Sequence, residues 1–179
     1  MFKISNSLAY SNAMVHQKKS REVQWPASCW FHVPRCNPSD GNHWLPAEGQ
    51  ELRHLLQDLI TTHKVPQNDI FLISPFRDVV KQLRIIRKEF GLNEKHVGTI
   101  HTTQGKEADV VILVLGGSNA GVRDWAASKP NLLNVAVSRA KVRFYVIGER
   151  NDWQNRPFFD VLSKFLPENP SPQKRSLGN

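Results

Sequence analysis

Short apolar runs alternate along the chain with segments in which apolar residues recur every three or four positions. An uninterrupted apolar run predicts a buried strand, whereas a spacing of three or four predicts a helix with one buried face. The apolar runs are residues 29–33, 70–74, 97–100, 109–115 and 142–148. The run at 109–115 is apolar on both faces, which is typical of a central strand in a parallel sheet.

Helical segments are expected between these strands. They cover residues 3–14, about 46–62, 75–91, about 130–140 and about 157–166, and residues 116–121 are expected to form a loop. Pro46 suits the first turn of its helix. Glu48 and Glu51 lie near the same end, where the positive end of the helix dipole stabilises acidic side chains. Strands separated by helices predict an α/β domain with a mostly parallel sheet.

The length and the end of the chain bound the domain organisation. The chain has 179 residues, which fits one globular domain of ordinary size. Three prolines fall within residues 167–172, in a polar stretch that predicts disorder. We therefore expect one domain over residues 1–166 and a disordered tail over residues 167–179.

One predicted helix, from Pro75 to Gly91, separates charge from apolar surface. Its cationic face carries Arg77, Lys81, Arg84 and Lys88, and its apolar face carries Val79, Leu83, Ile86 and Phe90. The periodicity has two interpretations: a solvated surface helix, or a face that lies near a phosphate backbone.

The charge of the whole chain favours an anionic partner. There are 24 Lys and Arg against 16 Asp and Glu, which gives a net charge of +8 at pH 7, and the excess is spread along the chain. Such a balance suggests nucleic acid first. The longest apolar run, residues 110–115, is far shorter than the roughly 20 residues that a membrane helix needs, so we expect no membrane partner.

The sequence also indicates the cell compartment and argues against a metal site. The start of the chain lacks the apolar core of a secretory signal, and two cysteines make no disulfide framework, so we expect a cytoplasmic protein. Cys29, His32, Cys36 and His43 are the residues that suggest a metal cluster. Their spacing matches no common zinc pattern, so reduced cysteines and no metal site are predicted.

The usual nucleotide-binding motifs are missing from the sequence. A GxxxxGK[ST] phosphate loop would need a Gly where Ile100 stands and a Ser or Thr where Glu107 stands. GxGxxG fails because Ser118 occupies the place of the second Gly, and no Asp-Glu dipeptide of the Walker B type is present. The chain therefore lacks the usual means of holding a nucleoside triphosphate and its Mg²⁺ by itself.

Two polar segments lie where ligands of a parallel sheet are expected, in loops beyond the strands. Residues 99–107 are a polar stretch between two buried strands, which alone indicates either an ordinary loop or a binding edge. Arg139 stands near the end of the helix in residues 131–141. Alone, it is most simply a cation that offsets the helix dipole.

Taken together, the segments resemble motifs of superfamily 1 helicases. The branch concerned includes the nonsense-mediated-decay RNA helicase and the replication nuclease-helicase. Motif V is matched by Val97, Thr99, Gln104, Gly105, Glu107, Asp109, Val111 and Ile112, motif VI by Asn134 through Lys141, and motif IV by Ile73, Ser74, Pro75 and Phe76. Order and spacing agree over residues 1–166. His101 replaces the usual acid of motif V.

The resemblance implies a RecA-like second motor domain of the P-loop NTPase class, without the Walker A and B domain. Arg139 would be the arginine finger, because a planar guanidinium suits charge growing on a γ-phosphate. Glu107 would accept from the ribose of ATP, beside a loop shaped by Gln104 and Gly105. Nucleic-acid contacts would come from Thr99, His101 and Thr102, and Arg77 on the cationic helix face is a further candidate for the strand.

The partners implied are single-stranded DNA or RNA and a Walker A-containing motor domain in cis or trans. ATP and Mg²⁺ would be shared with that domain, so we expect the chain to hydrolyse no ATP alone. Two alternatives are a non-catalytic nucleic-acid-binding module and an inactive fragment of a split helicase gene.

Overall fold

The computed structural model describes residues 23–34, 42–100, 102, 107–128 and 130–170. Its centre is one six-stranded sheet with the order β3-β2-β4-β5-β1-β6, in which every recorded strand pair is parallel. The strands are β1 (Trp30–His32), β2 (Ile70–Ser74), β3 (Val97–Thr99), β4 (Ala108–Val114), β5 (Ala140–Gly148) and β6 (Glu168–Pro170). The predicted α/β class and mostly parallel sheet are confirmed.

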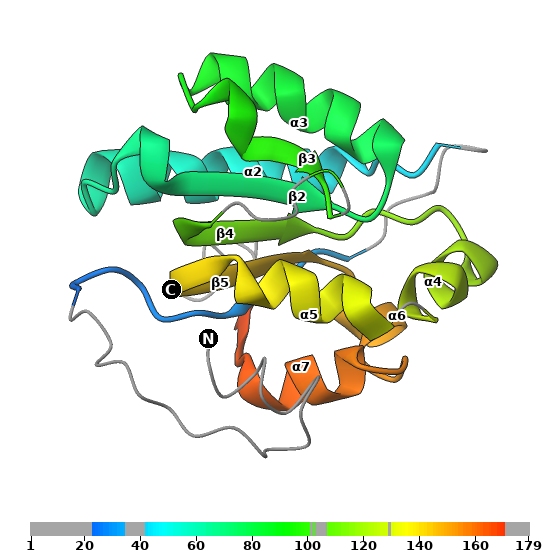
Figure 1. Cartoon of the computed structure of the whole chain (residues 1–179). Coiled ribbons are helices and arrows are strands. Elements are labelled where there is room, and N and C mark those ends of the chain that lie inside the picture. The colour runs from blue at the N-terminus through cyan, green and yellow to red at the C-terminus, as the bar shows by residue number, and fades with distance from the viewer. Residues whose placement is uncertain (1–22, 35–41, 101, 103–106, 129, 171–179) are drawn as a thin grey trace, which may run out of the picture.

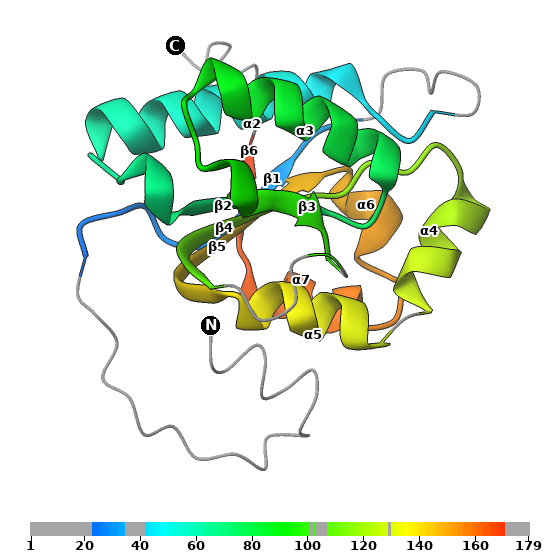
Figure 2. The same ribbon diagram turned by 45° about the horizontal axis from the view of Figure 1, so that its top comes forward.

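Helices cover both faces of the sheet (Figure 1, Figure 2). On one face lie α2 (Pro46–Gln57), which continues into a π-helical turn at Asp58–Thr62, and α3 (Arg77–Glu89). On the other lie α5 (Pro130–Ser138) and α7 (Phe159–Phe165). The remaining helices are α4 (Ala120–Ala127) and α6 (Arg150–Trp153). Among the described residues, no helix has the length and apolar character needed to cross a membrane.

Strand β4 forms the middle of the core. Residues 110–115 have no exposed surface, as predicted for a central strand. Its neighbours β2 and β5 register with it along their length, so that Leu72 pairs with Ile112 and Ile112 with Tyr145. Burial on both faces removes both rows of side chains from water, which is why helices are needed on both sides.

Helix α3 confirms the predicted division of its faces. Val79, Leu83 and Ile86 are buried against the sheet, while the cations at positions 77, 81, 84 and 88 are exposed. Arg53 of α2 holds the carboxylate of Glu89 at the end of α3 with two hydrogen bonds of 2.7 and 2.8 Å. These hydrogen bonds tie α2 to α3 on this face of the sheet. They also lower the pKa of Glu89.

Helix α4 replaces part of a predicted loop. Asn119 caps its first turn by accepting a hydrogen bond from Val122 N at 3.0 Å, which is the usual task of Asn at a helix start. The helix buries Arg123, Ala126 and Ala127. A buried Arg and two small residues give little apolar periodicity, so the pattern of the sequence does not indicate this helix.

Strand β6 lies inside the segment that the sequence predicted to be disordered. Glu168–Pro170 pairs in parallel with β1, and Trp30 N donates to Pro167 O at 2.9 Å. Arg150 supports the approach to this strand by donating to the carbonyls of Ser163 and Leu166. An edge strand tolerates proline, which explains why the prolines misled the prediction here. Residues 171–179 and the predicted helix at 3–14 lie outside the described residues.

A tight turn follows β4 and directs the chain toward α4. Gly116 and Gly117 both have positive φ, 61° and 96°. Gly116 N donates to the buried carboxylate of Glu48 at 2.8 Å, and Gly117 N donates to His43 O at 3.0 Å. The start of α2 therefore fixes the loop in which α4 begins.

We expect Gly116→Ala to lower the free energy of unfolding by about 2–4 kcal/mol, measured by urea unfolding. An added Cβ would lie 2.5 Å from His43 O and 2.6 Å from Val79 Cγ2, at a φ that L side chains rarely adopt. Gly121→Ala is the matched control, because an added Cβ there meets only Asn119 Oδ1 at 3.6 Å. It should not destabilise the protein, since alanine is more favourable than glycine in a helix by up to about 1 kcal/mol. Equal destabilisation by both changes would contradict this account.

Candidate functional site

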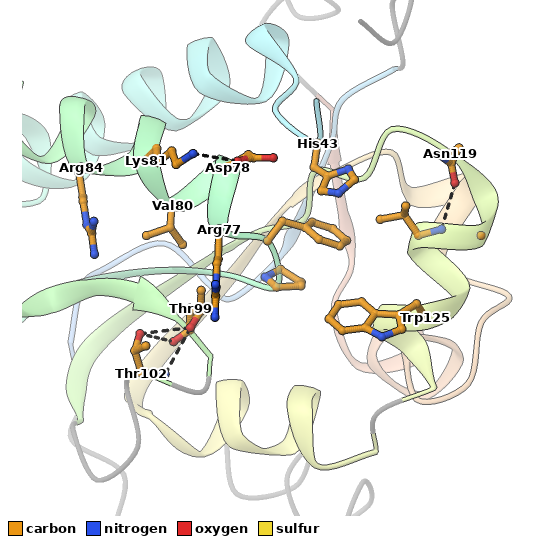
Figure 3. Close-up of a pocket in the computed structure, with 14 residues that line it drawn as sticks. His43, Arg77, Asp78, Val80, Lys81, Arg84, Thr99, Thr102, Asn119 and Trp125 are labelled. Carbon is orange, nitrogen blue, oxygen red and sulfur yellow. Dashed lines mark hydrogen bonds and ion pairs between the residues drawn. The ribbon is translucent and has the colours of Figure 1, made fainter. Parts of the chain in front are cut away.

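A hollow of about 1170 Å³ lies where the carboxyl ends of β2, β3 and β4 meet. Its walls come from the turn between β2 and α3, from α3 itself, from the end of β3 and from α4 (Figure 3). The residues used below are His43, Phe76, Arg77, Lys81, Arg84, Thr99, Thr102 and Trp125. The volume exceeds the roughly 300–1,000 Å³ of a typical small-ligand pocket, so the hollow has room for part of a longer ligand.

One side of the hollow is cationic. Arg77, Lys81 and Arg84 are exposed and line it from successive turns of α3. Asp78 stands among them, with its carboxylate 3.3 Å from the Lys81 ammonium. In Figure 3, Arg77 extends toward Thr99, while Lys81 turns toward Asp78. This wall therefore presents Arg77 and Arg84 to the hollow, with the charge of Lys81 between them offset by Asp78.

Beside this wall, Thr99 and Thr102 form a hydrogen-bonded turn at the end of β3. Thr102 N donates to Thr99 O at 3.0 Å, and the Thr102 hydroxyl donates to the same carbonyl at 3.0 Å. The two hydroxyl oxygens lie 3.2 Å apart. Fixed hydroxyls beside cations are groups that hold phosphate oxygens in protein–nucleic acid contacts. The structure thus brings together three of the predicted nucleic-acid residues, namely Arg77, Thr99 and Thr102.

The opposite side of the hollow is aromatic. The ring of His43 lies 4.6 Å from that of Phe76, and the ring of Phe76 lies 6.4 Å from that of Trp125. His43 is held by a contact of 3.1 Å between its Nδ1 and Ser118 Oγ. Sequence reasoning missed His43 and Trp125 as site residues, because one was considered only as a metal ligand and the other lies in the unpredicted helix α4.

Two predicted nucleotide-site residues lie at the other ends of the strands. Glu107 precedes β4 and Arg139 precedes β5, where Ala108 N donates to Arg139 O at 3.0 Å. Glu107 Oε2 lies 3.7 Å from Lys141 Nζ, and both side chains are about half exposed. Both residues therefore lie at the amino ends of the strands and not at the carboxyl ends, where the sequence pattern predicts ligands of the sheet.

Arg139 carries an unused donor. Its Nε is buried and has no hydrogen-bond partner in the described part of the chain. A buried donor without a partner costs free energy, and such groups are concentrated at functional sites.

A single stretch of chain connects the two edges. It leaves β3 at the carboxyl ends, beside Ser74, and enters β4 at the amino ends, beside Ala140. Thr99 and Thr102 belong to its first part and Glu107 to its last. The predicted residues His101, Gln104 and Gly105 fall within it and lie outside the described residues.

The residues once considered for a metal cluster have other contacts. His32 Nδ1 accepts from Arg150 N at 3.1 Å, and His43 contacts Ser118. Cys29 is buried, with Asn169 Nδ2 at 3.8 Å from its sulfur. Cys36 lies outside the described residues. Within the described ranges, no three His, Cys, Asp or Glu residues are grouped so that they could hold a metal ion.

Helix α4 is anchored to the turn after β4 by a buried guanidinium. Arg123 donates to Gly117 O at 3.1 Å, and its Nη2 lies 3.3 Å from the carboxylate of Asp152. The side chain is only 6% exposed, whereas that of Asp152 is 35% exposed. This buried contact fixes the wall of the hollow that carries Trp125.

Comparisons with known proteins agree with the geometry. A family model described as an AAA domain matches residues 2–151. The DNA polymerase alpha-associated DNA helicase A of Schizosaccharomyces pombe is 31% identical over 133 residues, which are 73% of this chain and 19% of that protein. Human RNA helicase Mov10l1 is 30% identical over 129 residues, 67% of this chain and 11% of that protein. The DNA replication ATP-dependent helicase/nuclease dna2 of S. pombe is 30% identical over 111 residues, which are 59% of this chain and 7% of that protein.

A solved structure shows the same fold. The crystal structure of the C-terminal domain of a possible DNA helicase from Lactobacillus plantarum WCFS1 matches with a TM-score of 0.56 at 13% identity, covering 94% of both chains. This likeness and the six-stranded parallel sheet confirm the predicted RecA-like fold. The chain spans less than one fifth of the length of the curated relatives named here.

We expect Arg123→Met to lower the free energy of unfolding by about 2–4 kcal/mol, because it removes the buried guanidinium that donates to Gly117 O and pairs with Asp152. Arg156→Met is the matched control: Arg156 also pairs with an aspartate, at 2.9 Å, but that aspartate, Asp124, is 65% exposed. Its loss is expected to cost less than about 1 kcal/mol. Chemical denaturation measures both, and similar costs would contradict the anchoring role of Arg123.

Proposed function

Because the chain belongs to the AAA domain family and is a superfamily 1 helicase C-terminal domain, we propose that it works as the second motor domain of an ATP-dependent helicase. A single strand of nucleic acid binds in the hollow at the carboxyl ends of the strands. ATP binds at the opposite edge, between this domain and a Walker A-containing motor domain joined in cis or in trans. Alone, the chain is inactive as an ATPase.

The observation that supports this proposal best is the position of Arg139. Its buried Nε has no partner in the described part of the chain, and its backbone is fixed by the hydrogen bond to Ala108 at the start of β4. A guanidinium is charged at any physiological pH and offers donors in a rigid plane. It is therefore suited to meet the charge of a phosphate group presented by another domain.

The remaining groups at this edge fit a shared nucleotide site. When bound, ATP would supply the phosphoryl group that is transferred to water, and Mg²⁺ would offset the charge of its phosphates. Glu107 is assigned to the ribose hydroxyls, as a carboxylate that accepts hydrogen bonds. Its present partner Lys141 is 3.7 Å away on an exposed surface, so the carboxylate can be released at little cost. The first motor domain provides the phosphate loop and the acid that binds Mg²⁺.

The strand-binding role is supported by the charge and the donors of the hollow. Arg77 and Arg84 stand seven residues apart on α3, a span of roughly 10 Å along the helix. Thr99 and Thr102 add hydroxyls beside them. These groups recognise the backbone rather than the base edges, which suits a motor that must act on any sequence.

We expect the chain alone to hydrolyse no ATP, and a chimera to restore hydrolysis. In the chimera, this chain replaces the matching segment of the S. pombe DNA helicase A. Arg139→Ala is expected to reduce the strand-stimulated kcat by at least about 10³-fold, because the finger stabilises charge only in the transition state. Phosphate release measures the rates.

Arg139→Lys is the matched variant, since it keeps the charge and loses the planar fork; it is expected to remain severely impaired. Arg156→Lys is the control outside the edge and should leave the rate unchanged. ATP hydrolysis by the isolated chain at a helicase-like rate, or an Arg139→Ala chimera as active as its parent, would refute the proposed role. The second outcome would favour the non-catalytic binding module.

We expect the chain to bind single strands with an affinity that falls steeply with salt. Combining Arg77→Ala and Arg84→Ala is expected to reduce the slope of log K against log salt by about 1.4, because two phosphate contacts to a single strand are lost. Lys164→Ala is the matched control, a 74% exposed cation on α7 at the other face of the sheet. Fluorescence anisotropy measures binding. An equal effect of Lys164→Ala would show that the charge acts without a defined site.

A further inference from the structure

We propose that Trp125 is a stacking platform for one unpaired base of the bound strand, with Phe76 behind it. The inference rests on the proposed strand binding in the hollow and adds a second kind of contact to it. The cationic wall holds phosphates, whereas the aromatic wall receives a base. No helicase motif matched by the sequence includes Trp125.

The exposure of Trp125 sets it apart from the aromatic residues of the core. It is 51% exposed, whereas Phe76 beside it is 4% exposed. The two rings lie 6.4 Å apart and are inclined by 33°, so Phe76 supports the indole from within the protein. Figure 3 shows the indole of Trp125 at the end of the hollow opposite Arg84.

Other exposed apolar side chains do not share this position. Among the described residues, the large hydrophobic side chains that are exposed are Ile85, Trp125 and Phe165, and only Trp125 lines the hollow. Isolated exposed apolar residues are common and need no function. An exposed indole that faces a cationic wall across a hollow is a different case, because the two surfaces match the two parts of a nucleotide.

The chemistry of the hollow favours a nucleobase over an apolar side chain of a protein partner. Arg77, Arg84 and two threonine hydroxyls line the same space, and an apolar partner would bury the two guanidinium groups without offering them a counter-charge. Lys81, by contrast, already has the Asp78 carboxylate at 3.3 Å. A nucleotide satisfies both walls, since its phosphate is anionic and its base has an aromatic face. Stacking depends little on base identity, so it fits a strand of any sequence.

The platform is held in place before the ligand arrives. Asn119 caps the first turn of α4, and Arg123 ties this helix to the turn after β4. His43 packs on Phe76 with 4.6 Å between ring centres. A rigid aromatic surface loses little conformational freedom on binding, and a preformed site gains affinity from this.

The test compares two oligonucleotides bound by the 179-residue chain at low salt, using fluorescence anisotropy. One is a labelled oligothymidylate of about 12 nucleotides, within the usual site size of strand-binding modules. The other has the same length but carries abasic residues, so that it keeps the phosphates and loses the bases. We expect the first to bind about tenfold more tightly, given the affinity that stacking of one base provides.

Variants separate stacking from charge. Trp125→Ala is expected to bind both oligonucleotides as weakly as the parent chain binds the abasic one, with the same salt dependence. Trp125→Phe should keep most of the preference for bases. Phe165→Ala is the matched control, an exposed aromatic residue outside the hollow, and should behave as the parent. Stacking should also quench the indole emission, and this quench should be lost in Trp125→Phe. The same measurement with an oligouridylate of equal length shows whether the chain binds RNA as tightly as DNA.

The outcomes distinguish the two proposals. If the parent binds neither oligonucleotide, strand binding in the hollow is overturned, and the platform with it. If it binds both equally and Trp125→Ala changes nothing, strand binding stands and the platform is overturned, which would leave Trp125 as a contact for another protein surface. If Phe165→Ala weakens binding as much as Trp125→Ala, stacking at this position is overturned as well.

Discussion

The complete burial of β4 is the constraint on which the rest of this domain depends. Because both faces of the strand are apolar, helices must cover the sheet on both sides, and α2 with α3 and α5 with α7 do so. The parallel arrangement then brings the ends of β2, β3 and β4 to one edge, although the segments that follow them are distant in sequence. The hollow is a consequence of this convergence, since each strand end contributes one part of its wall.

The turn after β4 fixes the position of α4 relative to the buried strand, and with it one wall of the hollow. A carboxylate with no exposed surface is costly, so Glu48 must be compensated, and the amide of Gly116 provides one hydrogen bond at 2.8 Å. The positive φ of Gly116 and its contact with Val79 leave no space for a side chain. The first turn of α2, the end of β4 and the start of α4 are therefore one unit. Displacement of any of them would move the wall that carries Trp125.

The sequence predicted what depends on local pattern and missed what depends on distant contacts. The apolar runs identified β2, β4 and β5, and the spacing of charges identified the exposed face of α3. Helix α4 was missed because its buried face includes Arg123, whose partners Gly117 and Asp152 cannot be inferred from periodicity. Strand β6 was missed because its three residues are polar or proline and are ordered by pairing with β1. Likewise, motif V indicated Thr99 and the charge pattern of α3 indicated Arg77. His43 and Trp125 of the aromatic wall lie outside the motifs, and only Phe76 belongs to one.

The separation of the two edges bears on how a motor of this design would couple its ligands. The stretch between β3 and β4 begins beside Thr99 in the hollow and ends at Glu107 on the edge that carries Arg139. Both ends are fixed in the sheet, by the pairing of β3 with β2 and of β4 with β5. Under the proposed function, closure of the other motor domain on Arg139 would move this sheet as one body, and Thr99 and Thr102 would move with it relative to that domain. The sheet itself need not deform, which is consistent with the close packing of β4 and its neighbours.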